Sequence, residues 1–365
     1  MSDSTQFDQY LHEDGPTALV IREHLTSIEG SDGVLFPATF AAGDGFPGGY
    51  NIDTDGNGSN VCLIDSVGSQ ANRIEPLFAK EGYKDLIPQI TIKAGEKEVN
   101  LLEAGHRAGD AIVRCSQLQQ TLQDAFKSVL RGDAQPLAKI APTSLVFGVW
   151  DSRDTQAKLP RLVASTIRAY NVRRLTRSAQ YTPATEYVKE NLLDEPADKA
   201  TSDAYAVRGF IHVPATGSHG GVIATGGVRR DASLGLAALR LLFAGKDEQK
   251  TLALRRYILG LALTAFTNNP TGYLRQGCFL VLDPGKPREF VEVYPNGDRK
   301  PATVTHEAAL SFARAAAKQF GVGENRSAEF DKERAKRDVA GDGEGKKKRK
   351  KDRKAESKAE AEEGN

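Results

Sequence analysis

The sequence is poor in the residues that build disulfide or metal frameworks. Its 365 residues include three cysteines, Cys62, Cys115 and Cys278, and no two of them form a CxxC pair. An odd number of widely separated cysteines argues against a disulfide scaffold or a structural zinc site and is typical of a reducing compartment. We therefore expect a cytoplasmic protein that carries no metal and no other cofactor.

Long apolar runs and targeting segments are also lacking. The longest apolar stretch, Tyr257–Phe266, is too short to span a bilayer. The first residues have neither the basic region nor the apolar region of a signal peptide. The sequence thus predicts no membrane partner.

The motifs of common enzyme classes are missing as well. The segment Thr225–Asp231 contains glycines, but it lacks the lysine and the hydroxyl of a phosphate-binding loop. The segment Asp53–Gly58 has the acids and glycine of a calcium loop, yet Ile64 stands where the loop needs a glutamate. We accordingly predict no catalytic residue and no metal ligand.

The charge of the chain is small overall but unevenly distributed. The formal net charge is +1, yet no acidic residue occurs between Thr155 and Tyr181. Because strand residues alternate between two faces, Arg168 and Tyr170 would share one face of a strand there. A cation beside an aromatic ring suits single-stranded nucleic acid, whose phosphates need charge and whose bases need a flat partner. We interpret the stretch as an anion-binding surface; the alternative is an exposed sheet face with solvated arginines. Its basic residues are Lys158, Arg161, Arg168, Arg173, Arg174 and Arg177.

A second candidate site lies at the start of a predicted helix over Asp65–Ala79, with Ser66 as its N-cap. The first backbone N–H groups of a helix have no partner within the helix, so they can hold a phosphate. Ser69 and Gln70 add short donors, and Arg73 follows about one turn later.

Elsewhere, hydrophobic periodicity predicts strands that alternate with helices, which is typical of an α+β protein. The predicted strands are 17–25, 87–93, 144–150, 161–175 and 207–213, and a hairpin-like pair of 278–282 and 289–294. The predicted helices, besides the one above, are 105–130, 233–243, 248–266 and 305–320.

One large domain over residues 1–330 accounts for these elements. Residues 41–60 and 180–203 are predicted to be insertions, and residues 214–231 a glycine-rich segment. Residues 331–365 are dominated by charge and contain no aromatic residue. Such a segment cannot bury enough apolar surface to offset its ordering entropy, so we expect a disordered tail.

Several blocks of the sequence resemble a known family. DSVGSQANRIE, FGVWDSR, PRLVASTIRAY, LRRYILGLALTAF and YLRQGCFLV resemble the backbone subunit of CRISPR Cascade complexes of the RAMP superfamily, in the type I-G (formerly I-U) variety. The resemblance covers about residues 17–320. It implies an RRM-like or ferredoxin-like palm with large finger and thumb insertions.

The resemblance also implies partners and a function. Such subunits stack head-to-tail as a filament along the guide RNA (crRNA) and leave its bases free to pair with target DNA, in antiviral defence. The other implied partners are further Cascade subunits, namely a large subunit and a guide-processing or end-capping subunit.

Related subunits bind RNA phosphates at the start of their first helix, and Gly68, Ser69, Gln70 and Arg73 match that segment. Ala71 and Asn72 depart from it, because relatives often have lysine or glycine there. A glycine-rich loop typical of the superfamily adds Arg229 and Arg230. The full set of RNA-binding candidates is Arg22, Gly68, Ser69, Gln70, Arg73, Arg153, Lys158, Arg161, Arg168, Tyr170, Arg173, Arg174, Arg177, Arg229 and Arg230.

Two alternatives stay open at this point. Some relatives are endoribonucleases that act on guide precursor or target RNA, and Asp53, Asp55 and Asp65 are available for such a reaction. A scaffold that binds only proteins is the other alternative, but it leaves the acid-free basic stretch unexplained.

Overall fold

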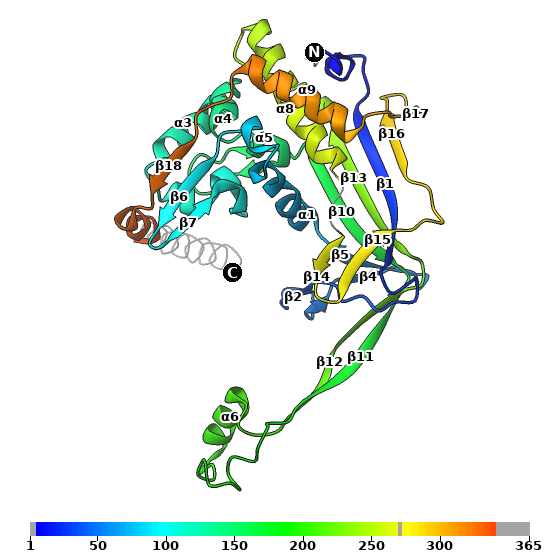
Figure 1. Cartoon of the computed structure of the whole chain (residues 1–365), viewed down its shortest axis with the longest axis vertical. Coiled ribbons are helices and arrows are strands. Elements are labelled where there is room, and N and C mark those ends of the chain that lie inside the picture. Colours follow the sequence, from blue (N-terminus) through cyan, green and yellow to red (C-terminus); the bar gives the residue numbers. More distant parts are fainter. Residues whose placement is uncertain (1–4, 269–271, 341–365) are drawn as a thin grey trace, which may run out of the picture.

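The computed structural model describes residues 5–268 and 272–340 (Figure 1). Its centre is a nine-stranded sheet in which β14, β15, β1, β13, β10, β5 and β4 follow one another, while β16 also pairs with β1 and β17 with β16. All these pairs are antiparallel, so the fold is α+β, as predicted. The strands are β1 Ala18–Ser27, β4 Ile52–Thr54, β5 Asn60–Asp65, β10 Val163–Tyr170, β13 Val228–Gly235, β14 Tyr273–Arg275, β15 Cys278–Leu282, β16 Glu289–Val293 and β17 Arg299–Pro301.

Helices cover one face of this sheet (Figure 1). The main core joins Leu19, Ile21 and Leu234 of the sheet to the buried length of α8 (Glu248–Thr267). Helix α9 (His306–Phe320) packs on α8 so closely that a Cβ atom at Gly260 would lie 2.7 Å from the Ala313 Cα. Helices α1 (Val67–Ile74) and α5 (Thr143–Phe147) contact β10 on the same face. The opposite face is left open, and its side chains are half-buried.

A second, smaller core lies farther along the covered face. It gathers Cys62, Ile64, Ile167 and Ala169 from β5 and β10 against Leu274, Cys278 and Leu280 of β14 and β15. On β1 and β13, the charged residues Glu23 and Arg230 separate the positions that belong to the two cores. Buried charge therefore lies between the two apolar clusters, and this arrangement positions a cavity described below.

A long hairpin, here called the arm, projects from the sheet (Figure 1). It consists of β11 (Val172–Tyr181), β12 (Val213–Ala224) and the segment between them with α6 (Lys199–Arg208). Asn171, with φ of 48°, ends β10 and starts β11, so the predicted strand 161–175 is in fact two strands. The predicted insertion 180–203 forms most of the outer part of the arm.

A helical region with a small sheet completes the fold. In this sheet β6 lies between β7, its antiparallel partner, and β18, its parallel partner. The elements here are β6 Ile90–Ala94, β7 Lys97–Asn100, β18 Arg326–Glu329, α2 Ala111–Arg114, α3 Gln119–Leu130 and α4 Gln135–Ile140. The remaining short elements are β2 Thr39–Phe40, β3 Gly49–Tyr50, β8 Val149–Trp150, β9 Lys158–Leu159, α7 Leu236–Leu239 and the 3₁₀ turns Asp8–Leu11, Glu75–Ala79, Lys84–Leu86, Leu101–Glu103 and Arg107–Gly109.

Several sequence predictions were wrong, each for a local reason. The apolar run 144–150 begins as α5, because residues buried on all sides carry no periodicity that separates helix from strand. The predicted helix 105–130 is interrupted, with Arg107 at φ 52°. The predicted strand 207–213 is wrong at its start, because residues 207 and 208 are the end of α6. The predicted helix 233–243 is shorter in the structure, where it is α7. The glycine-rich segment 214–231 belongs largely to β12 and β13, and β15 and β16 pair with β1 instead of with each other.

The charged tail begins as an ordered helix over residues 332–340, in contrast to the expected disorder from Asp331 onward. Its contacts to the domain are specific: Arg334 donates to the Ser116 carbonyl at 2.8 Å, and Arg114 pairs with Asp338 at 2.9 Å. Residues 341–365, the rest of the predicted tail, lie outside the described residues. No helix in the described ranges is both long and apolar enough to cross a membrane.

Candidate nucleic-acid interface

A row of basic side chains crosses the open face of the central sheet. His24 of β1 lies directly opposite Arg229 of β13, and Arg229 lies directly opposite Arg168 of β10. Directly paired residues of antiparallel strands share a face, and like charges in that position repel. Tyr170 lies next to Arg229 on this face: the Arg229 guanidinium is 4.8 Å from the centre of the Tyr170 ring and donates to the Tyr170 hydroxyl at 2.8 Å. We call His24, Arg168, Tyr170 and Arg229 the basic row.

Acidic neighbours neutralise only part of this row. Asp231 is shared by Arg22 at 3.2 Å and Arg229 at 2.9 Å, and Glu289 lies 3.6 Å from Arg22. The Arg168 side chain has no hydrogen-bond or ion-pair partner within the part of the chain that the structure describes. An unneutralised guanidinium beside an aromatic ring can contact a phosphate and a stacked base.

The arm continues the positive charge away from the sheet. Arg173 and Arg174 are exposed where β11 leaves the sheet, and Arg177 lies farther out with its guanidinium 5.6 Å from the Phe36 ring. The acid-free stretch therefore does not form one strip on the sheet. Its cations divide between the region beside α1, the basic row and the base of the arm.

The predicted start of α1 is confirmed in detail. The Ser66 side chain accepts a hydrogen bond from the Ser69 backbone N–H at 3.3 Å, as an N-cap does. The exposed Arg161 lies beside this first turn, with its Nη2 about 4.0 Å from the position that a Cβ of Gly68 would take. Two separately predicted groups of residues are thus brought together. Lys158 lies over the Trp150 ring at 5.5 Å, and Arg153 is in the exposed turn between β8 and β9.

The polar side chains of α1 face inward to one carboxylate. Asp65 is buried and accepts hydrogen bonds from Ser69 Oγ at 2.9 Å, Gln70 Nε2 at 2.7 Å, Arg73 Nε at 3.1 Å and Arg275 Nη2 at 2.8 Å. Gln70 also accepts from Ser165 at 2.9 Å, so both ends of its amide are engaged. These side chains fix α1 to the sheet. The backbone N–H groups of the first turn remain the part of this segment that can receive a phosphate.

Asp65 is consequently shielded by donors, whereas the other two carboxylates that the sequence offered to a nuclease lie at the surface. Asp53 is exposed on β4, and Asp55 is exposed in the following turn, where it accepts from the Asn57 backbone N–H at 3.0 Å. Among the described residues, no group of three or more His, Cys, Asp or Glu side chains could hold a metal ion.

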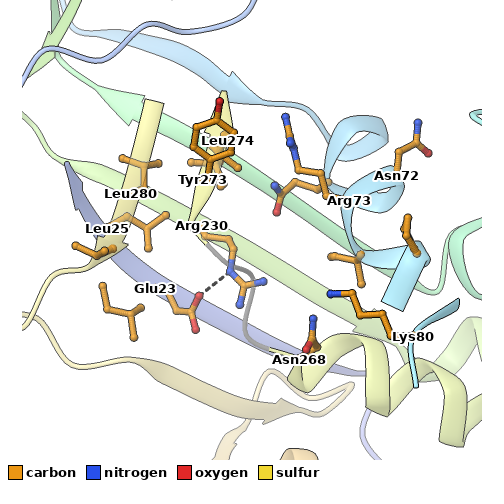
Figure 2. Close-up of a pocket in the computed structure, with 17 residues that line it drawn as sticks. Glu23, Leu25, Asn72, Arg73, Lys80, Arg230, Asn268, Tyr273, Leu274 and Leu280 are labelled. Atoms are coloured by element: carbon orange, nitrogen blue, oxygen red, sulfur yellow. Dashed lines mark hydrogen bonds and ion pairs between the residues drawn. The ribbon is translucent and has the colours of Figure 1, made fainter. Parts of the chain in front are cut away.

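Arg230 lies on the other face of the sheet from its neighbour Arg229. It is 3% exposed and pairs with the buried Glu23 at 2.6 Å, and Glu23 also lies 3.0 Å from Arg288. This ion pair borders a cavity of about 730 Å³ between α1, the end of α8 and β14–β15 (Figure 2). Burial raises the pKa of the Cys62 thiol to about 12 and that of Cys278 to about 11, so neither is a reactive nucleophile.

Sequence reasoning missed the partners of these residues. His24 was not among the candidate residues, and the roles of Asp231, Arg275 and Arg288 had no local signal. All of these contacts join elements that are distant along the chain, for example positions 23 and 230. The prediction that Arg168 and Tyr170 share one face of a strand, by contrast, is confirmed: both lie on the half-buried face of β10.

Residues 19–174 match the model of a family described as CRISPR-associated protein GSU0053. The matched segment runs from β1 through α1 and β10 to the first residues of the arm. No curated protein matches the chain.

Proposed function

We propose that this chain is a non-catalytic subunit that coats the guide RNA of a type I surveillance complex, because its residues 19–174 match the model of a CRISPR-associated family. The observation that carries the proposal is the basic row on the open sheet face. It offers Arg168, whose side chain has no partner among the described residues, next to the aromatic ring of Tyr170. Both residues precede the exposed arginines at the base of the arm. Such a surface holds an RNA backbone through charge and stacking, with little dependence on base identity.

The order of the main strands supports an RRM-like palm. Along the chain, β1 is followed by α1, then by β10 and β13, then by α8 and finally by β15. In the sheet these strands lie in the order β15, β1, β13, β10. A βαββαβ chain arranged in this way is the ferredoxin-like pattern. The arm and the segment between β1 and β5 are then the inserted thumb and finger.

A head-to-tail filament requires a surface that binds another copy. The edge of the sheet formed by β14 and β15 exposes apolar side chains, and an exposed apolar edge favours association. A contact of this kind that does not close into a ring builds an open filament. The exposed residues are Tyr273, Phe279, Val281 and Leu282.

The first test measures binding of the purified full chain to single-stranded RNAs of increasing length at low and high salt, with light scattering. The mass of the complexes is expected to rise in steps with RNA length. The affinity is expected to fall steeply with salt, with a slope of about −0.7 for each phosphate contact. A fixed mass at every RNA length would contradict the coating proposal, and shortened RNA in the recovered sample would favour an endoribonuclease instead.

Charge reversal on the proposed surface gives a second test. The double variant R168E/R174E is expected to bind RNA at least about tenfold more weakly and to reduce the salt slope by about 1.4, because two phosphate contacts are lost. The matched control is K127E, at an exposed position of α3 away from the sheet. Equal RNA affinity of R168E/R174E and wild type would favour a scaffold that binds only proteins.

A further inference from the structure

Two buried carboxylates on the covered face of the sheet are each shared by two arginines. Glu23 lies 2.6 Å from Arg230 and 3.0 Å from Arg288. Asp65 lies 3.1 Å from Arg73 and 2.8 Å from Arg275. One negative charge in each cluster thus faces two positive charges. Arg230 is buried, whereas Arg73, Arg275 and Arg288 are partly exposed. Because buried positive charge is costly unless an anion compensates it, the Glu23 cluster favours a further anion near Arg230.

One donor of the first cluster has no hydrogen-bond partner among the described residues. The Arg230 side chain is 3% exposed, and its Nη2 makes no hydrogen bond within the described residues. A buried donor left without an acceptor costs free energy, which a ligand atom would recover. Arg230 lines the 730 Å³ cavity, and Figure 2 shows its head group facing the space that Lys80 and Asn268 also border.

The cavity combines this polar end with an apolar wall. Arg73 and Asn72 of α1 also line the cavity, although Arg73 donates to Asp65 and Asn72 accepts from Arg107. Tyr273 of β14 is half-exposed at the cavity. The volume lies in the range of small-molecule sites, which are mostly apolar with a few converging polar groups. The apolar lining residues are Leu25, Ile74, Pro76, Ile167, Leu274 and Leu280.

We propose that this cavity is a binding site for a nucleoside phosphate. The phosphate would accept hydrogen bonds from Arg230 Nη2 and Lys80 Nζ, and the sugar and base would lie against the aliphatic wall and Tyr273. An arginine fork and an ammonium suit a phosphate, which offers several acceptor oxygens and a negative charge. Because the cavity is bordered by more positive than negative side chains, a metal cation is disfavoured as its ligand. The site lies on the opposite sheet face from the basic row, so its phosphate contacts are separate from those of the guide-coating surface. It shares Tyr273 with the apolar edge proposed above to bind another copy.

The nucleoside phosphate has two sources, a free nucleotide or one unit of an RNA strand. The experiment measures binding of AMP, inorganic phosphate and a short single-stranded RNA to the full chain by isothermal titration calorimetry. AMP is expected to bind more tightly than inorganic phosphate because the apolar wall holds the nucleoside. If the RNA displaces AMP, the occupant is a unit of the strand; if RNA and AMP bind together, it is a free nucleotide. Both results support the site.

Variants test which residues hold the phosphate. Lys80→Ala is expected to weaken AMP binding about tenfold, whereas Lys84→Ala, four residues later at an exposed position outside the cavity, leaves it unchanged. Arg230→Lys keeps the charge but removes the fork, and it is expected to weaken AMP binding at least as much. AMP that fails to bind at about 1 mM overturns the proposal. Equal affinity for AMP and inorganic phosphate, unchanged AMP binding by Lys80→Ala, or displacement of AMP by a glutamate hexapeptide but not by RNA would also overturn it.

Discussion

Replacement of Arg107 by methionine is expected to lower the free energy of unfolding by about 3–5 kcal/mol. Arg107 is 3% exposed, and its Nε lies 2.7 Å from Oε2 of Glu75, which is 1% exposed. The arginine also donates to the Gly148 carbonyl at 3.2 Å and to the Asn72 side chain at 3.2 Å. Without it, a buried carboxylate loses its ion-pair partner, and the Gly148 carbonyl and the Asn72 side chain each lose a donor. Urea denaturation measures the loss.

The control is the double variant E75L/R107M, which removes both charges. Apolar replacement of a buried ion pair is often nearly neutral, so this variant is expected to recover most of the loss. If the single variant R107M, which keeps Glu75, is as stable as wild type, the Glu75–Arg107 ion pair does not determine stability here.

The loss also has a predicted pH dependence. Burial, the larger cause, raises the pKa of Glu75 from 4.5 to about 7, while Arg107 opposes this rise. A carboxyl whose pKa is higher in the folded state binds its proton more tightly there, so its contribution to stability grows as the pH falls from about 7 toward 4.5. In R107M the opposing charge is gone. The deficit of R107M relative to wild type should therefore be larger at pH 8 than at pH 5.5, and an unchanged deficit would contradict this explanation.

Replacement of Asp65 by alanine is expected to cost about 3 kcal/mol and to loosen α1. The variant removes the acceptor for Ser69, Gln70, Arg73 and Arg275 at once. The arginines are partly exposed, at 36% and 24% of their side chains, so water recovers some of the loss. Hydrogen exchange of the α1 amides and urea denaturation measure the two effects.

The matched control is Asp53→Ala on β4, which is exposed and is expected to change stability by less than about 0.5 kcal/mol. The pair of variants also tests the alternative function. An RNA-cleaving activity lost in D53A, at unchanged stability, would overturn the proposal of a non-catalytic subunit. A loss below about 1 kcal/mol in D65A would contradict the anchoring role of Asp65.

Local sequence patterns correctly predicted those elements whose formation depends on residues that are near one another in the sequence. The alternation along β10, the Ser66 cap and the helices α8 and α9 follow from side-chain spacing and from single polar residues at element ends. The resemblance to a CRISPR-associated family, read from short sequence blocks, is confirmed by the family match over residues 19–174. The subtype and the palm description stay predictions.

The parts that could not be predicted depend on distant contacts. Glu23 and Arg230 are charged residues in otherwise apolar alternation, and only their pairing across the sheet explains why both are buried. The run that forms α5 is apolar throughout, so its sequence does not distinguish a helix from a strand. The basic row likewise exists only because β1, β13 and β10 are neighbours, which spacing along the chain does not reveal.

The attachment of the arm has a mechanical consequence. Its two strands are continuations of β10 and β13, and the junction is clamped by hydrogen bonds between Tyr170 N and Gly227 O at 2.9 Å and between Gly226 N and Tyr170 O at 2.9 Å. A Cβ atom at Gly226 would lie 2.8 Å from the Tyr170 carbonyl oxygen. Replacing Gly226 by any other residue would therefore push the two strands apart at this point. The base of the arm is therefore fixed directly to the strands that carry Arg168 and Arg229, so a change in the direction of the arm at its base has to move both strands.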